Sequence, residues 1–567
     1  MQKQLFLIGF LLSTLGLFAQ NEPKQVTSTF ALQNVTIVQA PGKVIEGGTI
    51  VVKDGLIHAA GKNVSIPFDA KKIKADSMYV YAGFIDGASH VGIPKVEKKE
   101  EGGRRGRSQN KNVGNPPNEQ AGIQPERPAR EVMKAGEKSI GDMRKLGFTT
   151  AHVVPDGKML PGKGAIILLA GESVNDMILM ENTALFAQFK GAGGVYPNTV
   201  IAVMSKFRDL YKQAEQAKAH KATFVNNPSG IKRPTSDPVL EAFYPVIDGE
   251  QAIFMKASNM KDLSRAMVLQ KELGYELVLT EVKQGWNYVD QMKGGKIFLS
   301  LDLPKAPKEN KKKEEEEAKE KTMEEKEAEA MEQRRAVRMK EFETQAMMMA
   351  SKGVNFGFST LDAKAKDIRP NLMRMIEAGL TEDQALAALT TQPAKMLGID
   401  KVTGTVEKGK IANLVVTDAP YFKKESNVRY VLVDGHLFEY EAKAKKKKKK
   451  AKEGEEPAEN ASVAGVWTYE MSIPGQELSG TLTFKVDGED VTGTMSDPSG
   501  EDDDEELTDI VLDGDTMTFS ISVDQGGATM SVEFTLEFDG EAYEGKMSIS
   551  NFGSFDVEGV RAEKPER

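Results

Sequence analysis

The sequence of 567 residues contains no cysteine, two tryptophans and five histidines. The absence of cysteine excludes disulfides, thiolate metal ligands and lipid attachment to a cysteine. After the N-terminal region, no apolar run approaches the ~18 residues that a membrane-spanning helix requires. An integral membrane protein is therefore not expected, and stability must come from burial of apolar side chains.

The first 20 residues have the pattern of a secretory signal peptide. Lys3 gives a positive start, residues 5–18 are almost continuously apolar, and polar residues follow Gln20. The apolar run is short for a membrane span, which favours cleavage over anchoring. We expect a periplasmic or secreted protein, and the alternative is an uncleaved N-terminal anchor.

Charge is distributed unevenly along the chain. The net charge is −9, but residues 462–567 contain 25 acidic and five basic residues, a net charge of −20 that leaves +11 for the remainder. An exported protein with such an acidic module is not expected to bind nucleic acid. Residues 441–461 are rich in Lys and Glu and predict a linker. Residues 462–562 alternate short strand patterns with Gly and Asp turns, which predicts a small acidic β-barrel or sandwich.

The segments on either side of the central region have strand patterns. Asp54-Gly55 lies between two apolar runs and predicts a tight hairpin. Further strands are predicted at 31–38, 412–416 and 430–437. Residues 21–80 and 399–440 together predict a small composite β domain.

Residues 81–398 alternate short apolar strands with amphipathic helices. Helices are predicted at 129–145 and 261–273, and strands at 147–154, 276–280 and 297–301. This alternation indicates a parallel sheet, and its length suits a (β/α)8 TIM-type barrel. Two insertions, 95–130 and 305–345, are charged or rich in Gly and Pro and are expected to add little core, whereas Met347–Met349 are expected to return to the core. The predicted fold class is thus α/β, with a composite β-sandwich and a C-terminal all-β domain.

Three motifs resemble those of the amidohydrolase superfamily. Ala82-Gly83-Phe84-Ile85-Asp86-Gly87-Ala88-Ser89-His90 is similar to the family's first barrel strand, which usually reads Pro-Gly-Phe-Ile-Asp-x-His-x-His. Residues 380–398 resemble its last barrel helix, and residues 404–416 resemble its closing Gly-Lys-x-Ala-Asp-Leu segment. The resemblance covers roughly residues 27–440, and is nearest to imidazolonepropionase-like and dipeptidase-like members.

The resemblance implies a divalent metal, typically zinc, held by His and Asp side chains at the strand ends. This chain departs from that pattern at most ligand positions. The first His is replaced by Ala88 and a later His by Lys256, whereas His90 is retained. Glu281 stands where His or Gly is common in the family. Leu361 occupies the position of the general-base Asp, and Asp362, one residue on, can substitute only if the strand end shifts. No intact cofactor site is expected, and no residue is assigned as a metal ligand.

The remaining polar residues near the predicted strand ends are the candidate site. The catalytic candidates are His90, His152, Glu281 and Asp362, and the substrate-pocket candidates are Asp86, Lys256 and Thr360. Without a metal, the carboxylates of Asp86 and Glu281 need another positive partner, and we hypothesise that Lys256 supplies it.

Several functions remain open for this chain. The resemblance implies an exported hydrolase of C–N bonds, acting on small amide or peptide-like substrates through an altered site. The alternative is a binding or scaffold protein that keeps the barrel without its chemistry, because fold alone does not decide function. Whether the chain is an enzyme is therefore left open. A third interpretation gives the C-terminal domain a partner in the cell envelope.

Overall fold

The computed structural model describes residues 29–94, 112–305, 323–440 and 463–562, the last range with gaps at 474–475, 488–489, 497–504, 514–515, 526–527 and 550–552. The predicted signal peptide, the linker 441–461 and the segments 95–111 and 306–322 of the two charged insertions lie outside these residues. The chain divides into two compact units, Met1–Ala444 and Lys445–Arg567. In the described residues, no helix is both long and apolar enough to cross a membrane.

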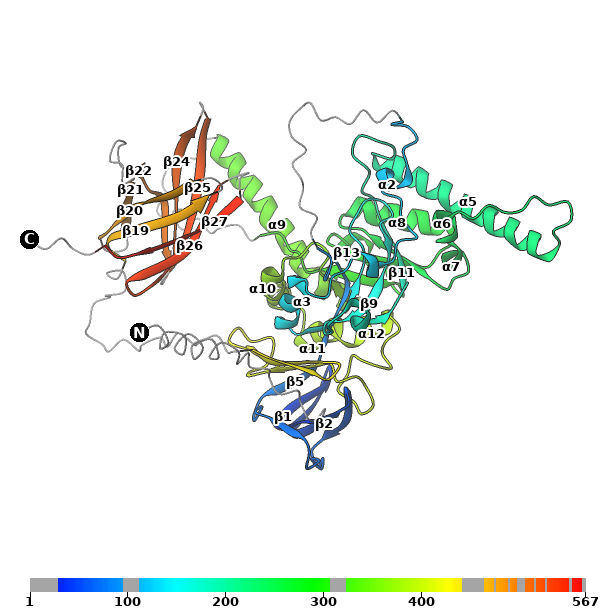
Figure 1. Cartoon of the computed structure of the whole chain (residues 1–567), viewed down its shortest axis with the longest axis horizontal. Helices are drawn as coiled ribbons and strands as arrows, with labels where there is room; N and C mark the ends of the chain where they lie inside the picture. Colours follow the sequence, from blue (N-terminus) through cyan, green and yellow to red (C-terminus); the bar gives the residue numbers. More distant parts are fainter. Residues whose placement is uncertain are drawn as a thin grey trace, which may run out of the picture. The chain divides into compact units, whose positions relative to one another are not determined.

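One sheet of the first unit combines strands from both flanks of the central region. Its order is β18-β17-β16-β5-β1-β2-β3, with β4 pairing β1, and Figure 1 shows these blue and yellow strands together. The strands are β1 (Thr29–Ala40), β2 (Lys43–Lys53), β3 (Leu56–Gly61), β4 (Lys71–Ile73), β5 (Tyr79–Ala82), β16 (Leu414–Thr417), β17 (Val428–Val433) and β18 (His436–Glu439). The antiparallel pairing of β5 with β16 joins the two distant segments. The predicted hairpin is β2–β3, and its turn residue Asp54 has a positive φ of 51°.

Parallel strands form the centre of the same unit. They are β6 (Phe84–Ser89), β7 (Phe148–Val153), β11 (Ala184–Gln188), β12 (Ala252–Lys256), β13 (Leu277–Val282), β14 (Lys296–Ser300) and β15 (Gly357–Ser359). β6 pairs β7, and β11 to β15 pair in chain order.

Two seams connect these groups of strands. At one seam, the amide of Thr360, which follows β15, donates to the carbonyl of Ala88 on β6 at 3.1 Å. At the other seam the chain runs antiparallel through β8 (Gly162–Lys163) and β9 (Ala165–Leu168). β9 pairs β7 and also β10 (Ile178–Met180), whereas β8 pairs β11. The strands therefore form two sheets, β10-β9-β7-β6 and β15-β14-β13-β12-β11-β8, which the chain between β8 and β9 links at one seam and the Thr360–Ala88 hydrogen bond links at the other.

The two faces of these strands bury different clusters, as the two-residue period of a strand requires. On β12, Ile253 and Met255 belong to the large cluster that also contains helix residues such as Leu263. Ala252 and Phe254 belong instead to a small apolar cluster with Ala88, Val154, Ala184, Phe186, Val278, Phe298 and Leu361. The strands therefore enclose an apolar interior and carry helices on their other face.

Helices follow most of the parallel strands. The longer ones are α3 (Lys138–Lys145), α5 (Val200–Asn226), α8 (Met260–Leu273), α9 (Met323–Ser351), α10 (Ala365–Glu377), α11 (Glu382–Leu389) and α12 (Thr391–Met396). The shorter ones are α2 (Asn118–Ala121), α4 (Val174–Met177), α6 (Pro238–Glu241), α7 (Tyr244–Ile247) and the 3-10 turns Ala129–Glu131 and Trp286–Tyr288. The side chain of Asn259 caps α8, and Gly274 ends it in the left-handed region, close to the predicted bounds.

Two sequence expectations are wrong here. Residues 129–145 are not one helix, because a 3-10 turn and a break precede α3. The insertions also contribute to the core. Ala121, Ile123 and Ala129 of the first, and Phe342 near the end of the second, are buried in the main cluster. Short apolar contributions within a polar segment do not produce a period that sequence patterns reveal. Met349 is fully buried as expected, and Met347 and Met348 pack against the core.

The C-terminal unit is all β. Its strands are β19 (Gly465–Ile473), β20 (Gln476–Asp487), β21 (Asp490–Ser496), β22 (Glu505–Glu506), β23 (Thr508–Asp513), β24 (Thr516–Gln525), β25 (Ala528–Asp539), β26 (Ala542–Ile549) and β27 (Gly553–Val560). The order is β22-β21-β20-β19-β27-β26-β25-β24-β23. β22 pairs with β21 and β23 pairs with β24, and only one residue separates β22 from β23. The two ends of the sheet are therefore joined by one nearly continuous strand. Aromatic residues around the fully buried Trp467 fill its inside.

Candidate functional site

The candidate site lies where the parallel strands end. Asp86 and His90 come from β6 and the residues after it, and Lys256 ends β12. Glu281 is near the end of β13, and Thr360 and Asp362 follow β15. Because parallel strands present their carboxyl ends at one edge, these side chains can meet. The structure does bring several of them together, in two connected groups.

The first group is Asp86 with Thr360. The Thr360 hydroxyl donates to one carboxylate oxygen of Asp86, while the amides of Thr360 and Ala88 donate to the other at 3.2 and 3.3 Å. Asp86 is fully buried, and burial raises its pKa to about 8 despite these hydrogen bonds. The nearby carboxyl of Glu281 adds to the increase in pKa. Asp86 is therefore a protonated, structurally held carboxyl at neutral pH.

The second group is centred on Glu281, which the backbone directs inward. The β13–β14 ladder shifts register between Leu279 and Val282, and Glu281 has a φ of 56°. A bulge of this kind turns a side chain away from its regular strand direction, and a positive φ is uncommon for Glu. Glu281 is fully buried and accepts hydrogen bonds from the hydroxyls of Ser300 and Ser359, the latter at 2.7 Å. Burial raises its pKa, and the charge of Asp362 adds to this effect.

Lys283 lies among three carboxylates. Its Nζ is 2.5 Å from Asp302 Oδ2, 3.2 Å from Asp362 Oδ2 and 3.7 Å from Glu281 Oε1, and its side chain is 18% exposed. Burial opposes its charge, but Glu281 and the two aspartates raise its pKa overall. Lys283 is thus a permanent cation at the point where these acidic side chains converge.

Lys256 extends this network through Asp362. Its Nζ lies 2.5 Å from Asp362 Oδ1, so Asp362 bridges the two lysines. Although burial opposes it, pairing with Lys256 and Lys283 lowers the pKa of Asp362. The hypothesis that Lys256 compensates the charges of Asp86 and Glu281 is therefore wrong, because Lys256 pairs with Asp362 instead. Lys283 is the lysine beside Glu281, and Asp86 is held by hydrogen bonds instead of by a cation.

Sequence reasoning missed Lys283, Asp302, Ser300 and Ser359. Lys283 lies three residues after the predicted strand 276–280, and Asp302 directly follows the predicted strand 297–301, which is where strand-end sites gather their side chains. The spacing Glu281-x-Lys283 was a signal available in the sequence. The contribution of Ser300 and Ser359 depends on the bulge at Glu281, which no local pattern indicated.

The two candidate histidines have different environments. His152 is fully buried, and its two ring nitrogens contact the Gly87 carbonyl at 3.1 Å and the Thr183 hydroxyl at 2.8 Å. Burial lowers its pKa to about 4, so the ring is neutral and both nitrogens are occupied. This arrangement supports a packing role for His152. His90 is only half-buried, and its Nδ1 contacts the carbonyl of Val154 at 2.8 Å. It is the better candidate for contact with a ligand.

The donor set does not fit the divalent metal that the sequence resemblance implies. Across the described ranges, no group of three or more His, Asp or Glu side chains is arranged to hold a metal ion. Glu281, Asp302 and Asp362 converge on the ammonium of Lys283, and the nitrogens of His152 have other partners. A metal would have to displace a lysine cation from these carboxylates.

An aromatic side chain also fills the interior behind the site. Phe298 is fully buried, and a Cβ on Gly87 would lie 1.9 Å from its ring. Phe298 stacks with Phe254, which in turn contacts the ring of His152. Leu361, at the position of the family's general base, is buried in the same apolar cluster. The interior next to the strand ends is therefore packed with apolar side chains.

Comparison with known proteins agrees with this fold. The sequence model of the amidohydrolase family matches residues 303–438. The fold is similar to that of an amidohydrolase from Thermotoga maritima MSB8, with a TM-score of 0.57 and 18% identity, over 72% of this chain and 100% of that one. The sequence match confirms the resemblance to the amidohydrolase family over residues 303–438, and the match to the Thermotoga maritima structure shows a similar fold over most of the first unit.

Two further solved structures match with lower TM-scores. A prolidase complexed with N-methylphosphonate-L-proline has a TM-score of 0.42 and 16% identity, over 73% of this chain and 100% of that one. Phenylurea hydrolase B has a TM-score of 0.42 and 14% identity, over 72% and 96%. No curated protein matches the sequence. The fold assignment therefore rests on the Thermotoga maritima structure.

Proposed function

We propose that this chain is an exported protein with a modified amidohydrolase (β/α)8 barrel that has lost metal-dependent hydrolysis and now serves as a binding or scaffold protein. In this barrel, seven parallel strands and the antiparallel segment β8–β9 would complete the circuit. The observation that carries the proposal is Lys283, whose ammonium lies within 4 Å of three carboxylates.

The chemical reason concerns what a lysine can and cannot replace. An ammonium compensates the negative charge of Glu281, Asp302 and Asp362, so the site remains stable without a metal. It cannot act as a Lewis acid that lowers the pKa of a bound water to the neutral range. The resemblance places the general-base Asp at the position of Leu361, which is buried among apolar side chains. Leucine cannot accept a proton, so the usual general base is missing as well.

One observation favours a second candidate function, a hydrolase of C–N bonds that works without a metal. His90 is half-buried beside the charged network. Burial lowers its pKa, the charge of Lys256 lowers it further, and the charge of Asp362 opposes the decrease. A histidine fixed through Nδ1 can act as a general base through Nε2. Substrates would be the small amides or dipeptides that the sequence resemblance implies.

Metal analysis combined with an activity assay separates these functions. The purified full chain would be incubated with zinc or manganese, dialysed and analysed for its metal content, then assayed on dipeptides and N-acyl amino acids. Less than 0.1 equivalent of metal and no hydrolysis are expected, an approximate threshold set by the tight binding of intact sites. One retained equivalent would overturn the proposal. Metal-free hydrolysis that His90→Ala abolishes would establish the second function instead.

Export rests on residues 1–20 and has its own test. Mass spectrometry of the protein recovered from a secreting host should give a chain that begins near Asn21. A chain that retains Met1 and sediments with membranes would support the uncleaved anchor.

A further inference from the structure

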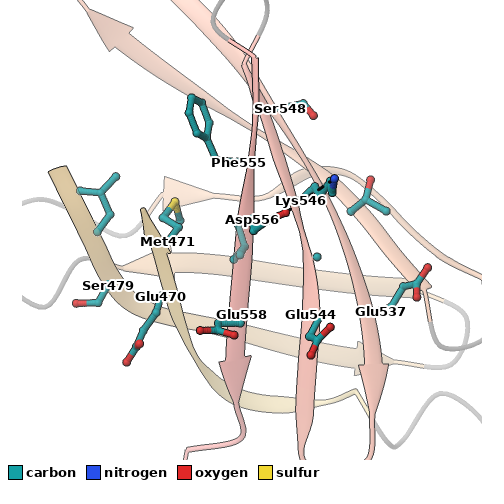
Figure 2. Close-up of a pocket in the computed structure, with 14 residues that line it drawn as sticks. Glu470, Met471, Ser479, Glu537, Glu544, Lys546, Ser548, Phe555, Asp556 and Glu558 are labelled. Carbon is teal, nitrogen blue, oxygen red and sulfur yellow. Dashed lines mark ion pairs between the residues drawn. The ribbon is translucent and has the colours of Figure 1, made fainter. Parts of the chain in front are cut away.

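The outer face of the C-terminal unit is hollowed where β19 and β27 separate. The ladder between these two strands consists of the pairs Glu470–Glu558 and Met471–Val557. In the described part of this unit, their pairing does not continue from Met471 toward the end of β19. A hollow of about 1300 Å³ opens at this separation, and Figure 2 shows the residues around it. Among the described residues, no ladder pair joins the two strand edges across this gap.

Part of the lining is apolar. Met471 and Val557 are buried in the core of the unit, while Leu478 and Phe555 are partly buried and pack against that core. All four line the hollow. The separation of the strands therefore exposes a path from the apolar interior to the surface, which can receive an apolar side chain of a ligand.

A row of four glutamates lies beside this apolar wall. Glu470 pairs with Glu558, Glu558 with Glu544, and Glu544 with Glu537, directly across four neighbouring strands. All four are exposed and line the hollow. With strands ~4.8 Å apart, the row is ~14 Å long.

This row destabilises the unit unless a cation is bound. Like charges directly opposite each other in a sheet repel. The other two charged groups in the lining, Lys546 and Asp556, pair with each other at 3.9 Å and leave the row uncompensated. Retaining an unfavourable surface feature next to the partly buried apolar side chains of Leu478 and Phe555 is typical of a binding site.

We propose that this groove binds an extended segment of a partner protein in which lysine or arginine alternates with apolar residues. The basic side chains contact the glutamate row, and the apolar ones contact Phe555 and Leu478. The free edges of β19 and β27 can pair with the backbone of an extended segment. A metal ion is a poorer fit, because no described group of carboxylates is arranged to hold one. The hollow also exceeds the ~300–1,000 Å³ of ordinary small-molecule pockets.

The test uses the full chain and two fluorescein-labelled peptides. One alternates lysine with leucine, and the other contains the same number of lysines alternating with serine. Binding is followed by fluorescence anisotropy at low and at physiological salt. We expect the lysine–leucine peptide to bind at least about tenfold more tightly than the lysine–serine peptide, because only the former fills the apolar wall.

Two double variants isolate the glutamate row. Glu544→Gln with Glu558→Gln should weaken binding of the lysine–leucine peptide about tenfold and reduce its salt dependence. Glu506→Gln with Glu533→Gln makes the same change of charge at exposed positions outside the lining and should change affinity less than about twofold. The first variant relieves repulsion, so its C-terminal unit should melt at a higher temperature, and unfolding cannot explain weaker binding.

Three results would overturn this inference. Equal weakening by both variants would indicate a general effect of the acidic unit. Absence of binding at low salt would show that the groove is not a peptide site. Residues 445–450 are six consecutive lysines. If binding becomes detectable only after these lysines are replaced by serine, the chain's own segment competes for the groove, and the proposed partner protein is wrong.

Discussion

Replacing Lys283 by Met is the most direct test of the strand-end site. The substitution keeps most of the side-chain volume and removes a cation that lies 2.5 to 3.7 Å from three carboxylate oxygens. Glu281 is fully buried and loses its lysine contact, while Asp362 keeps Lys256. The variant is therefore expected to fold but with markedly lower stability.

The size of the effect follows from the burial of the group. Removing one partner of a buried ion pair costs about 3–5 kcal/mol. Because the Lys283 side chain retains 18% exposure and Glu281 can take up a proton, we expect the lower end, about 3 kcal/mol. For a unit of roughly 400 residues this corresponds to a decrease in Tm of about 3–4 °C.

Differential scanning calorimetry of the full chain would measure the change. The transition of the C-terminal unit should not move and serves as an internal reference. The control is Lys212→Met on α5, where an exposed lysine contacts Glu215 at 2.8 Å, and its loss should cost less than about 0.5 kcal/mol. The destabilisation caused by Lys283→Met should shrink as pH falls, because protonation neutralises the carboxylates left behind.

Divalent cations give a second readout of the same site. Calcium or manganese should partly restore the Tm of Lys283→Met, since Glu281 and Asp302 then lack their cation and Asp362 keeps only Lys256. The same ions should not raise the Tm of the wild-type chain. An unchanged Tm of the variant near pH 7.5 would refute the inference that Lys283 compensates buried negative charge.

Two further predictions concern buried groups of the same unit. Asp86 keeps its proton in the folded chain up to about pH 8, whereas the unfolded chain releases it near pH 4, so folding stability falls as pH rises between these values. His152, whose folded pKa is about 4, opposes this trend below about pH 6.5, so the decrease should emerge between pH 6.5 and 8, at about 2 kcal/mol. Glu281, whose pKa burial also raises, contributes to the slope with the same sign. Chemical denaturation should therefore show that Asp86→Asn reduces the slope, and an unchanged slope would assign it to another group. Gly87→Ala would place a methyl group 1.9 Å from the ring of Phe298 and should cost about 3 kcal/mol. Adding Phe298→Leu should recover part of that loss, and strict additivity in this double-mutant cycle would contradict the predicted contact.

Local patterns were sufficient for many elements of the fold. Asp54-Gly55 predicted the β2–β3 hairpin because few residue pairs accept that turn conformation. The apolar period of residues 261–273 predicted α8 almost to its bounds. The motif around Asp86 and the segment 404–416 carried the resemblance to the amidohydrolase family, and the family model matches residues 303–438. In each case the determining interactions lie within a few residues along the chain, so the sequence reveals them.

The sequence by itself was enough to predict changes at the family's ligand positions, because Ala88, Lys256 and Leu361 stand where the resemblance places those ligands. Only the tertiary structure decided which side chains meet at the strand ends. The bulge that turns Glu281 toward Ser300 and Ser359, and the approach of Lys283 to Asp302 and Asp362, depend on strands far apart in sequence. The row of four glutamates is likewise a product of strand register, which aligns residues separated by up to 88 positions. Charge compensation depends on distances of a few ångströms across strands, and only the folded chain sets those distances.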